Sequence, residues 1–214
     1  LSPAIFDAIR ETTTTGELAL TTTLDGLAAT ESLSAVPYDG RWLDVSNLWD
    51  LLTVNAALVD EAATTRPDDD ALGESVTVAD DAVLAGNVRV GPNVTVGGST
   101  AVGSNATIEA GAVVENSVVF PDAVIGAGAV VRDAVVAGNA RIGPNATIAG
   151  EPATVVVGDA VHRNVELAGV VGDNATVGAG ATLTDGAVVG DDVDADAGVV
   201  IDDRVESGAV VRRG

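Results

Sequence analysis

The chain has 214 residues, with 32 acidic and ten basic side chains, and a formal net charge of −22. All ten basic residues are arginine, and the chain contains neither cysteine nor methionine. This charge balance repels nucleic acid and anionic membrane surfaces, and the lack of cysteine excludes disulfides, a thiolate nucleophile and a zinc–cysteine site.

Hydrophobic residues make up 47% of the chain, which predicts a packed core rather than a disordered acidic tail. A lysine-free acidic surface over such a core predicts a cytoplasmic protein of an extreme halophile, where molar salt screens self-repulsion. An ordinary acidic protein is the alternative. No apolar run approaches the roughly 20 residues that span a bilayer, and no secretory leader is visible. Because the chain starts with Leu1, we expect a fragment of a longer protein.

Residues 1–63 have the composition of a small α/β domain. Ile5 and Ile9 follow Ser2-Pro3 and predict a short helix over residues 1–12, and apolar spacing predicts a second helix over residues 48–62. Between them, residues 32–45 have the pattern of one or two short strands with a turn at Asp39-Gly40. Residues 64–75 are polar and acidic and are predicted to form a linker.

Residues 76–214 repeat a six-residue phrase. Large aliphatic residues recur every sixth position, and a small or β-branched residue follows each of them four places later. The first set is Val78, Leu84, Val90, Val96, Val102, Ile108 and Val114. The phase slips by one at Val119 and again at Val136, and the pattern continues from Val165. A helix cannot use a strict period of six, whereas a triangular solenoid uses one short strand and one corner per hexad. Three hexads close one coil of about 18 residues, so the repeat predicts about seven coils.

The corners of such a solenoid need residues that tolerate a left-handed backbone, and Gly, Asn and Asp recur there. Asn-x-Thr occurs at Asn93, Asn105, Asn145 and Asn174, and each occurrence matches the N-glycosylation acceptor. The repeat alone generates this motif if Asn occupies the corner and Thr the strand. We favour the corner interpretation.

The repeat resembles the hexapeptide-repeat family, whose fold is the left-handed parallel β-helix. The resemblance implies the left-handed winding, which the residues alone do not give. The predicted fold class is therefore mainly β: a left-handed parallel β-helix over residues 76–214, preceded by a small α/β remnant. The family and the valine-rich prism faces also imply a homotrimer.

Residues 16–27 and 40–55 resemble the last part of the catalytic domain of sugar-1-phosphate nucleotidyltransferases. The match rests on Gly16-Glu17, on Trp42-Leu43-Asp44, and on Asp50-Leu51-Leu52 with Asn55. The resemblance implies a parent enzyme that makes NDP-sugars from a nucleotide and a sugar phosphate, with Asp44 helping to hold Mg²⁺. The family's glycine-rich nucleotide loop is missing from this chain, so we expect no nucleotidyl transfer from these 214 residues alone.

His162 is the only histidine, and the run from Val171 to Ala181 follows it. This order resembles the bifunctional members of the family, in which the β-helix carries an acetyltransferase. The resemblance implies that His162 is a general base for attack of a sugar amine on acetyl-CoA. The family's tyrosine is replaced here, and its phosphate-binding lysines would need substitutes such as Arg132, Arg141 or Arg163. Two alternatives to the nucleotidyltransferase portion therefore stay open: an acetyltransferase on the β-helix, and a purely structural assembly module.

Overall fold

The computed structural model describes residues 4–12, 20–30, 33, 36–62 and 72–214. It divides into two compact units, Leu1–Trp42 and Leu43–Gly214. The predicted origin of residues 1–63 in a nucleotidyltransferase domain concerns ancestry rather than packing, and it stays a prediction.

The first unit contains two helices, α1 (Ala4–Glu11) and α2 (Leu20–Ala29), which contact each other. The hydroxyls of Thr12 and Thr23 lie 2.8 Å apart, and Thr23 is buried. The helix predicted at the start of the chain is thus confirmed.

The strands predicted within residues 32–45 are not found among the described residues of that range, 33 and 36–45. Residues 32, 34 and 35 lie outside the described residues. Val36, Tyr38 and Trp42 are mostly exposed, with 85%, 71% and 83% of their surface accessible. Short strands persist where a buried face and a pairing partner hold them, and this segment has no such buried face.

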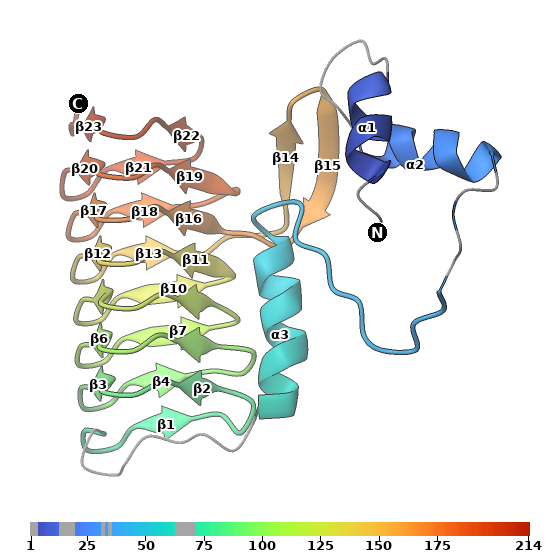
Figure 1. Cartoon of the computed structure of the whole chain (residues 1–214). Coiled ribbons are helices and arrows are strands. Elements are labelled where there is room, and N and C mark those ends of the chain that lie inside the picture. Colours follow the sequence, from blue (N-terminus) through green and yellow to red (C-terminus); the bar gives the residue numbers. More distant parts are fainter. Residues whose placement is uncertain (1–3, 13–19, 31–32, 34–35, 63–71) are drawn as a thin grey trace. The chain divides into compact units, whose positions relative to one another are not determined.

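The second unit is dominated by a three-sided solenoid whose sides are parallel sheets of seven strands each (Figure 1). Sheet I contains β1 (Thr77–Val78), β4 (Thr95–Val96), β7 (Val113–Glu115), β10 (Val130–Arg132), β13 (Thr147–Ile148), β18 (Thr182–Leu183) and β21 (Val200–Ile201). Sheet II contains β2 (Val83–Leu84), β5 (Ala101–Val102), β8 (Val118–Val119), β11 (Ala134–Val136), β16 (Gly169–Val171), β19 (Ala187–Val189) and β22 (Arg204–Val205). Sheet III contains β3 (Arg89–Val90), β6 (Thr107–Ile108), β9 (Val124–Ile125), β12 (Arg141–Ile142), β17 (Thr176–Val177), β20 (Asp194–Ala195) and β23 (Val210–Val211). Each coil supplies one strand to each sheet, so the predicted β-helix and its seven coils are confirmed.

The interior of the prism is built from stacked aliphatic residues, as the hexad predicts. Ile108, Ile125 and Ile142 are paired in register on consecutive strands of sheet III and are almost completely buried. The small residues four places after each aliphatic are also buried, including Ala106 and Ala112. Such a column removes apolar surface from water on every coil and leaves no room for large rings.

Val165 is the exception to the predicted hexad pattern. It is buried, but it belongs to a separate cluster outside the prism, and the sixfold pattern resumes inside the prism with Val171. The reason is an insertion in the fifth coil, described below. Assigning Val165 to the prism interior was therefore wrong.

The four asparagines of the Asn-x-Thr motifs occupy solenoid corners. Their φ angles are 57° at Asn93, 61° at Asn105, 56° at Asn145 and 58° at Asn174, which is the left-handed region. Asn adopts this region more readily than other residues with a side chain. The corner interpretation of the repeated motif is confirmed.

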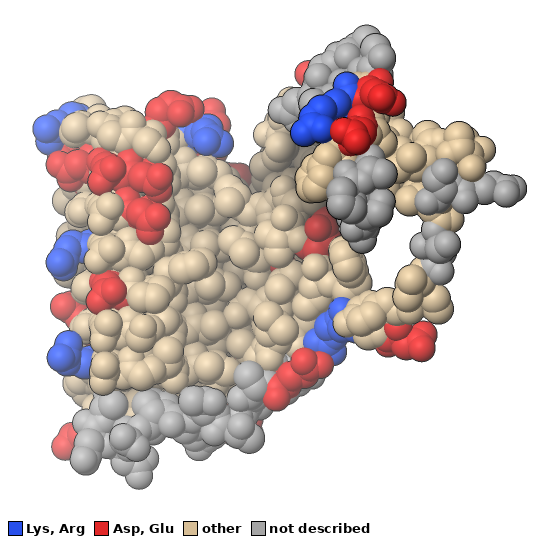
Figure 2. Space-filling model, viewed as in Figure 1, with Lys and Arg blue, Asp and Glu red and all other residues tan. Residues whose placement is uncertain are grey.

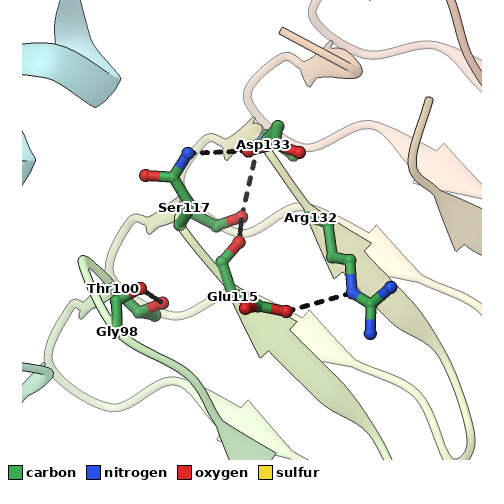
Figure 3. Close-up of polar contacts among 8 residues, drawn as sticks. Gly98, Thr100, Glu115, Ser117, Arg132 and Asp133 are labelled. Atoms are coloured by element: carbon green, nitrogen blue, oxygen red, sulfur yellow. Dashed lines mark hydrogen bonds and ion pairs between the residues drawn. The ribbon is translucent and has the colours of Figure 1, made fainter. Parts of the chain in front are cut away.

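The two phase slips shorten the corner between sheets I and II in the third and fourth coils (Figure 3). The buried hydroxyl of Ser117 donates to the carbonyl of Glu115 at 2.7 Å and accepts from the backbone N–H of Ala134 at 3.2 Å. Above it, the Asn116 amide donates to Asp133 at 2.6 Å. Side chains thus supply the hydrogen bonds that a full-length corner would make with its backbone.

Helix α3 (Asp50–Ala62) confirms the second predicted helix and runs along the outer surface of the solenoid (Figure 1). It contacts β8 and β11 of sheet II. Among the helices of the described residues, none combines the length and the apolar character needed to cross a membrane.

Candidate functional site

The fifth coil is interrupted by a β-hairpin at the corner between sheets I and II. Its strands are β14 (Ala153–Val157) and β15 (Ala160–Val165), which pair antiparallel after β13 and before β16. The two-residue turn starts at Gly158, whose φ of 57° suits the first position of a type II′ turn. The hairpin therefore leaves the stack without disturbing the coils on either side.

His162 lies on β15, opposite Val155 on β14, rather than at a solenoid corner. Its imidazole ring packs on the indole of Trp49, with ring centroids 4.9 Å apart and planes inclined at 55°. The side chain is half-buried. Within the described residues, no hydrogen bond or ion pair to the imidazole is found. The ring is therefore held by an aromatic contact.

Beneath this aromatic pair, α3 and the hairpin share an apolar cluster outside the prism. Its buried members are Leu52 of α3 and Val135, Val165, Leu167 and Val170 of the solenoid and hairpin. Trp49 and Val155 pack against the same cluster. We call α3, the hairpin and this cluster the α3–hairpin joint.

Polar contacts fix α3 at its start and in its middle. Asp50 Oδ2 accepts the backbone N–H groups of Ser46 and Asn47 at 3.0 and 2.7 Å, which satisfies donors that a helix start otherwise leaves unpaired. Further along, the Asn55 side-chain amide donates to the carbonyl of Ser99 on the solenoid at 2.8 Å. The motif residues Leu52 and Asn55 thus hold α3 on the β-helix, and Asp50 stabilises the start of the helix.

A cavity of about 520 Å³ opens beside the joint. Its walls come from the segment before α3, from β14 and from the corners of the sixth and seventh coils: Val45–Trp49, Leu51, Thr154–Val157, Leu167, Asp185, Gly186, Val188 and Asp202–Arg204. The lining includes three carboxylates, those of Asp185, Asp202 and Asp203, and one guanidinium, that of Arg204. Arg204 pairs with Glu206 at 3.3 Å, so the charge of this cavity is mainly negative. His162 is not among the lining residues.

Asp44 is exposed and accepts a hydrogen bond from the Ser46 hydroxyl at 2.8 Å. Ser46 stands where the nucleotidyltransferase pattern has glycine. Among the described residues, no three potential metal-ligating side chains of the His, Cys, Asp and Glu types lie together. The role of Asp44 as a Mg²⁺ ligand stays a prediction.

The three arginines considered as phosphate ligands lie on different parts of the second unit. Arg132 is paired with Glu115 at 3.2 Å at a solenoid corner (Figure 3). Arg141 lies on β12 of sheet III, and Arg163 lies on the hairpin. Of the three, only Arg163 shares a strand with His162.

The sequence interpretation missed the hairpin, the Trp49–His162 contact and the cavity. The hairpin had a signal: the β-branched run Val155-Val156-Val157 and the pair Ala160-Val161 flank Gly158-Asp159, a strong two-residue turn. No sequence signal indicated the contact between Trp49 and His162, because it joins segments far apart in the chain.

Residues 70–168 match the family model described as the GMPPB C-terminal domain. This match confirms the predicted resemblance. The matched segment is just under half of the chain and includes the first four coils, β13 and the whole hairpin with His162. The sequence-derived resemblance to the C-terminal part of a sugar-1-phosphate nucleotidyltransferase thus holds for the β-helix. No curated protein matches the sequence significantly.

Solved structures of hexapeptide-type transferases are similar to this chain in fold. One is a mutant GDP-perosamine N-acetyl transferase from Caulobacter crescentus in complex with CoA and GDP-perosamine, at 20% identity and a TM-score of 0.43, covering 74% of this chain and 58% of that one. Another is UDP-N-acetylglucosamine acyltransferase from Arabidopsis, at 17% identity and a TM-score of 0.40, covering 70% and 60%. A third is the acetyltransferase domain of PglB from Neisseria gonorrhoeae with acetyl coenzyme A, at 15% identity and a TM-score of 0.35, covering 81% and 80%. The chain spans about three fifths of the first two of these proteins.

Proposed function

We propose that this chain is the C-terminal portion of an NDP-sugar-forming sugar-1-phosphate nucleotidyltransferase, in which the β-helix holds copies of the enzyme together as a homotrimer. The observation that carries the proposal is the match of residues 70–168 to the GMPPB C-terminal domain, directly after the motif Asp50-Leu51-Leu52 with Asn55. A β-helix that follows such motifs is the order of parts that this class of enzyme uses.

The α3–hairpin joint gives this role a physical basis. Leu52 is 4% exposed beneath the hairpin, and Asn55 hydrogen-bonds the solenoid backbone, so α3 is held at two points along its length. A helix fixed in this way forms part of the rigid scaffold that the β-helix provides.

The parent activity also requires Mg²⁺, a nucleotide and a sugar phosphate. Mg²⁺ prefers carboxylate oxygens and usually takes one or two of them from protein, with phosphates completing its coordination. Asp44 is exposed and anionic, and its partner Ser46 leaves one carboxylate oxygen available for such a role. Because no group of three such ligands is found among the described residues, we assign no catalytic step to a metal in this chain.

An acetyl-CoA-dependent amino-sugar-phosphate acetyltransferase is the second candidate. It is favoured by the place of His162 on an insertion in the β-helix and by the Val171–Ala181 run that follows it. In this function, a neutral imidazole at His162 takes the proton of an amine as the amine attacks the thioester carbonyl. The third candidate, a purely structural module, needs neither His162 nor Asp44.

Adaptation to molar salt is the remaining part of the proposal. Acidic side chains cover the solenoid corners, for example Asp191 and Asp192 in the sixth coil. At low ionic strength their repulsion extends over roughly 30 Å, and at 1 M salt over only about 3 Å. We therefore expect the chain to fold in molar KCl and to lose stability on dilution of the salt.

One experiment separates the candidates. A longer chain that restores the upstream nucleotide loop is assayed in molar KCl for NDP-sugar formation with Mg²⁺, and the 214-residue chain is assayed for acetyl transfer to glucosamine-1-phosphate. We expect nucleotidyl transfer from the longer chain, unchanged by His162→Ala, and no acetyl transfer from either. Acetyl transfer that disappears in His162→Ala would instead make the β-helix a catalytic domain. A folded longer chain without either activity would favour the structural module.

A further inference from the structure

The cavity beside the α3–hairpin joint lies where the cover of sheet II ends. Val135, Val170 and Val188 are paired in register on consecutive strands of this sheet. Arg204 follows Val188 on the last coil. Val135 and Val170 are only 4% and 7% exposed in the cluster that they share with Leu52 of α3. Val188 and Arg204 instead line the cavity, which is therefore bounded by the part of this face that α3 leaves uncovered.

The cavity has the size and the walls of a small-molecule site. Its volume of about 520 Å³ lies within the roughly 300–1,000 Å³ of such sites. Its lining includes Val45 and Leu48 of the segment before α3 and Val157 of the hairpin, which are 49%, 41% and 48% exposed. Figure 2 shows the surface hollowed between the last coils and the hairpin. A ligand with an apolar body removes this exposed apolar surface from water.

The charged groups of the cavity favour a cation. Asp185 and Asp202 lie at the corners between sheets I and II in consecutive coils, and both side chains are exposed. Among the described residues, neither carboxylate has a hydrogen bond or an ion pair. Arg204 is the one basic residue of the lining, and its guanidinium is paired with Glu206. Two carboxylates are therefore available to a ligand, whereas the one guanidinium is already paired.

The start of α3 offers no counterweight, although helix starts often bind anions. The carboxylate of Asp50 already occupies it and accepts the backbone N–H groups of Ser46 and Asn47 at 3.0 and 2.7 Å. Asn47 also donates its side-chain amide to the same oxygen at 3.2 Å. The positive end of the helix is thus balanced by the chain itself, and a phosphate beside it would meet several carboxylates.

Trp49 supplies an aromatic surface beside these carboxylates. Its indole lines the cavity and also packs on His162, with ring centroids 4.9 Å apart. The face of an indole attracts a cation more strongly than any other aromatic side chain does. Carboxylates and an indole around one apolar space form an environment that suits an ammonium group attached to an apolar body.

We propose that this cavity binds a small organic cation, with its ammonium group at Asp185, Asp202 and Trp49 and its apolar body against Leu48 and Val188. A direct contact between an ammonium nitrogen and a carboxylate oxygen is about 3 Å long, no longer than the screening length at 1 M salt, so the attraction persists there. The site goes beyond the proposed function, because nucleotides, sugar phosphates and CoA all carry phosphate and are repelled by this cavity.

The first measurement is a titration of the full chain in molar KCl, followed by Trp49 fluorescence in a Trp42→Phe background. The three probes share a phenylethyl body and differ in charge: 2-phenylethylammonium, 2-phenylethanol and 3-phenylpropionate. We expect the ammonium to change the emission saturably, with a dissociation constant at least tenfold below that of the alcohol, and the propionate to bind more weakly still. Equal dissociation constants would overturn the preference for a cation. No saturable change with the ammonium would overturn the site.

The chain offers a matched pair of carboxylates for locating the charge. Asp185 and Asp192 are exposed aspartates at left-handed corners of the sixth coil, with φ angles of 57° and 56°, and only Asp185 lines the cavity. Asparagine adopts the same backbone region, so either substitution keeps the corner. We expect Asp185→Asn to raise the dissociation constant of the ammonium at least fivefold, and Asp192→Asn to leave it unchanged. Equal effects would show that net charge, not the cavity, attracts the probe, and would overturn the proposal.

A second measurement locates the cation without relying on Trp49. The nitroxide 4-amino-TEMPO is cationic at neutral pH, 4-hydroxy-TEMPO is its neutral analogue, and both broaden the amide NMR signals of residues near them. We expect the cationic nitroxide to broaden the signals of residues 154–157 and 202–204, which line the cavity, well before those of Asp191 and Asp192. Equal broadening at all acidic corners would contradict the proposed site.

Discussion

The prism interior and the α3–hairpin joint are both apolar, but they are specified in different ways. Inside the prism, each buried residue stacks on the same position of the next coil, as Ile125 does on Ile142. In the joint, Leu52 and Trp49 meet residues from a hairpin far along the chain, and each contact occurs once. Repetition makes the prism contacts redundant, whereas the joint depends on a few unique contacts that nothing else in the chain duplicates.

The largest effect is expected for a charge in the prism. Ile142 is 1% exposed between Ile125 and Val177, so Ile142→Asp buries a carboxylate that finds no partner. We expect a loss of at least about 4 kcal/mol in the free energy of unfolding, or no folding at all. Urea unfolding followed by circular dichroism in molar KCl measures this. Val156→Asp on the hairpin, where Val156 is 64% exposed, is the control and should change stability by less than about 0.5 kcal/mol.

Truncation of Leu52 tests whether the joint is a unit separate from the prism. Leu52→Ala removes a buried side chain and should cost about 2–5 kcal/mol of local stability. Amide hydrogen exchange should then accelerate in α3 and in the hairpin but stay slow in the sixth and seventh coils. Leu58→Ala, on the same helix but 49% exposed, should leave exchange unchanged. Faster exchange along the whole solenoid would show that joint and prism unfold together.

A smaller effect is expected where the prism departs from its own repeat. Ser117→Ala leaves the buried Ala134 N–H without its acceptor, which should cost about 1–3 kcal/mol. Ser104→Ala, at a corner of the preceding coil, is the control. It removes the same hydroxyl group, but no hydrogen bond of the Ser104 side chain is found among the described residues. Equal midpoints for the two variants in urea unfolding would mean that water replaces the Ser117 hydroxyl.

The same contrast explains what could be predicted from the sequence. A strict six-residue period has one geometric solution, so the coils, the buried aliphatics and the left-handed asparagines such as Asn93 and Asn145 followed from it. Val165 was wrongly assigned to the prism interior because it lies six residues before Val171, at the point where the hairpin rejoins the coil. Periodicity does not distinguish a residue that continues a repeat from one that ends an insertion.

The candidate site was less predictable for a physical reason. His162 could be singled out as the only histidine, and Asp44 by its resemblance to a family motif. Their surroundings depend on Trp49 and Ser46, which both lie in the segment before α3, and on how α3 packs against the hairpin. Contacts of this kind have no signature in local sequence, because neither partner repeats.

The smallest expected change concerns the Trp49–His162 pair, and it separates packing from catalysis. In a Trp42→Phe background, Trp49 is the only tryptophan, so its fluorescence reports on this contact. His162→Ala should move the Trp49 emission to longer wavelength and cost about 0.5–1.5 kcal/mol, the usual value of an aromatic pair. His162→Phe keeps a ring against Trp49 and should restore both.

The phenylalanine variant has no basic nitrogen, so it cannot act as a general base. If the role of His162 is to pack against Trp49 in the α3–hairpin joint, His162→Phe should match the wild type in stability and in assembly, and only His162→Ala should differ. Arg163→Ala, an exposed neighbour on the same strand, is the control for changes to the hairpin that do not touch Trp49. An acetyl-transfer activity that His162→Phe abolishes while stability is retained would assign the ring a chemical role that packing alone does not require.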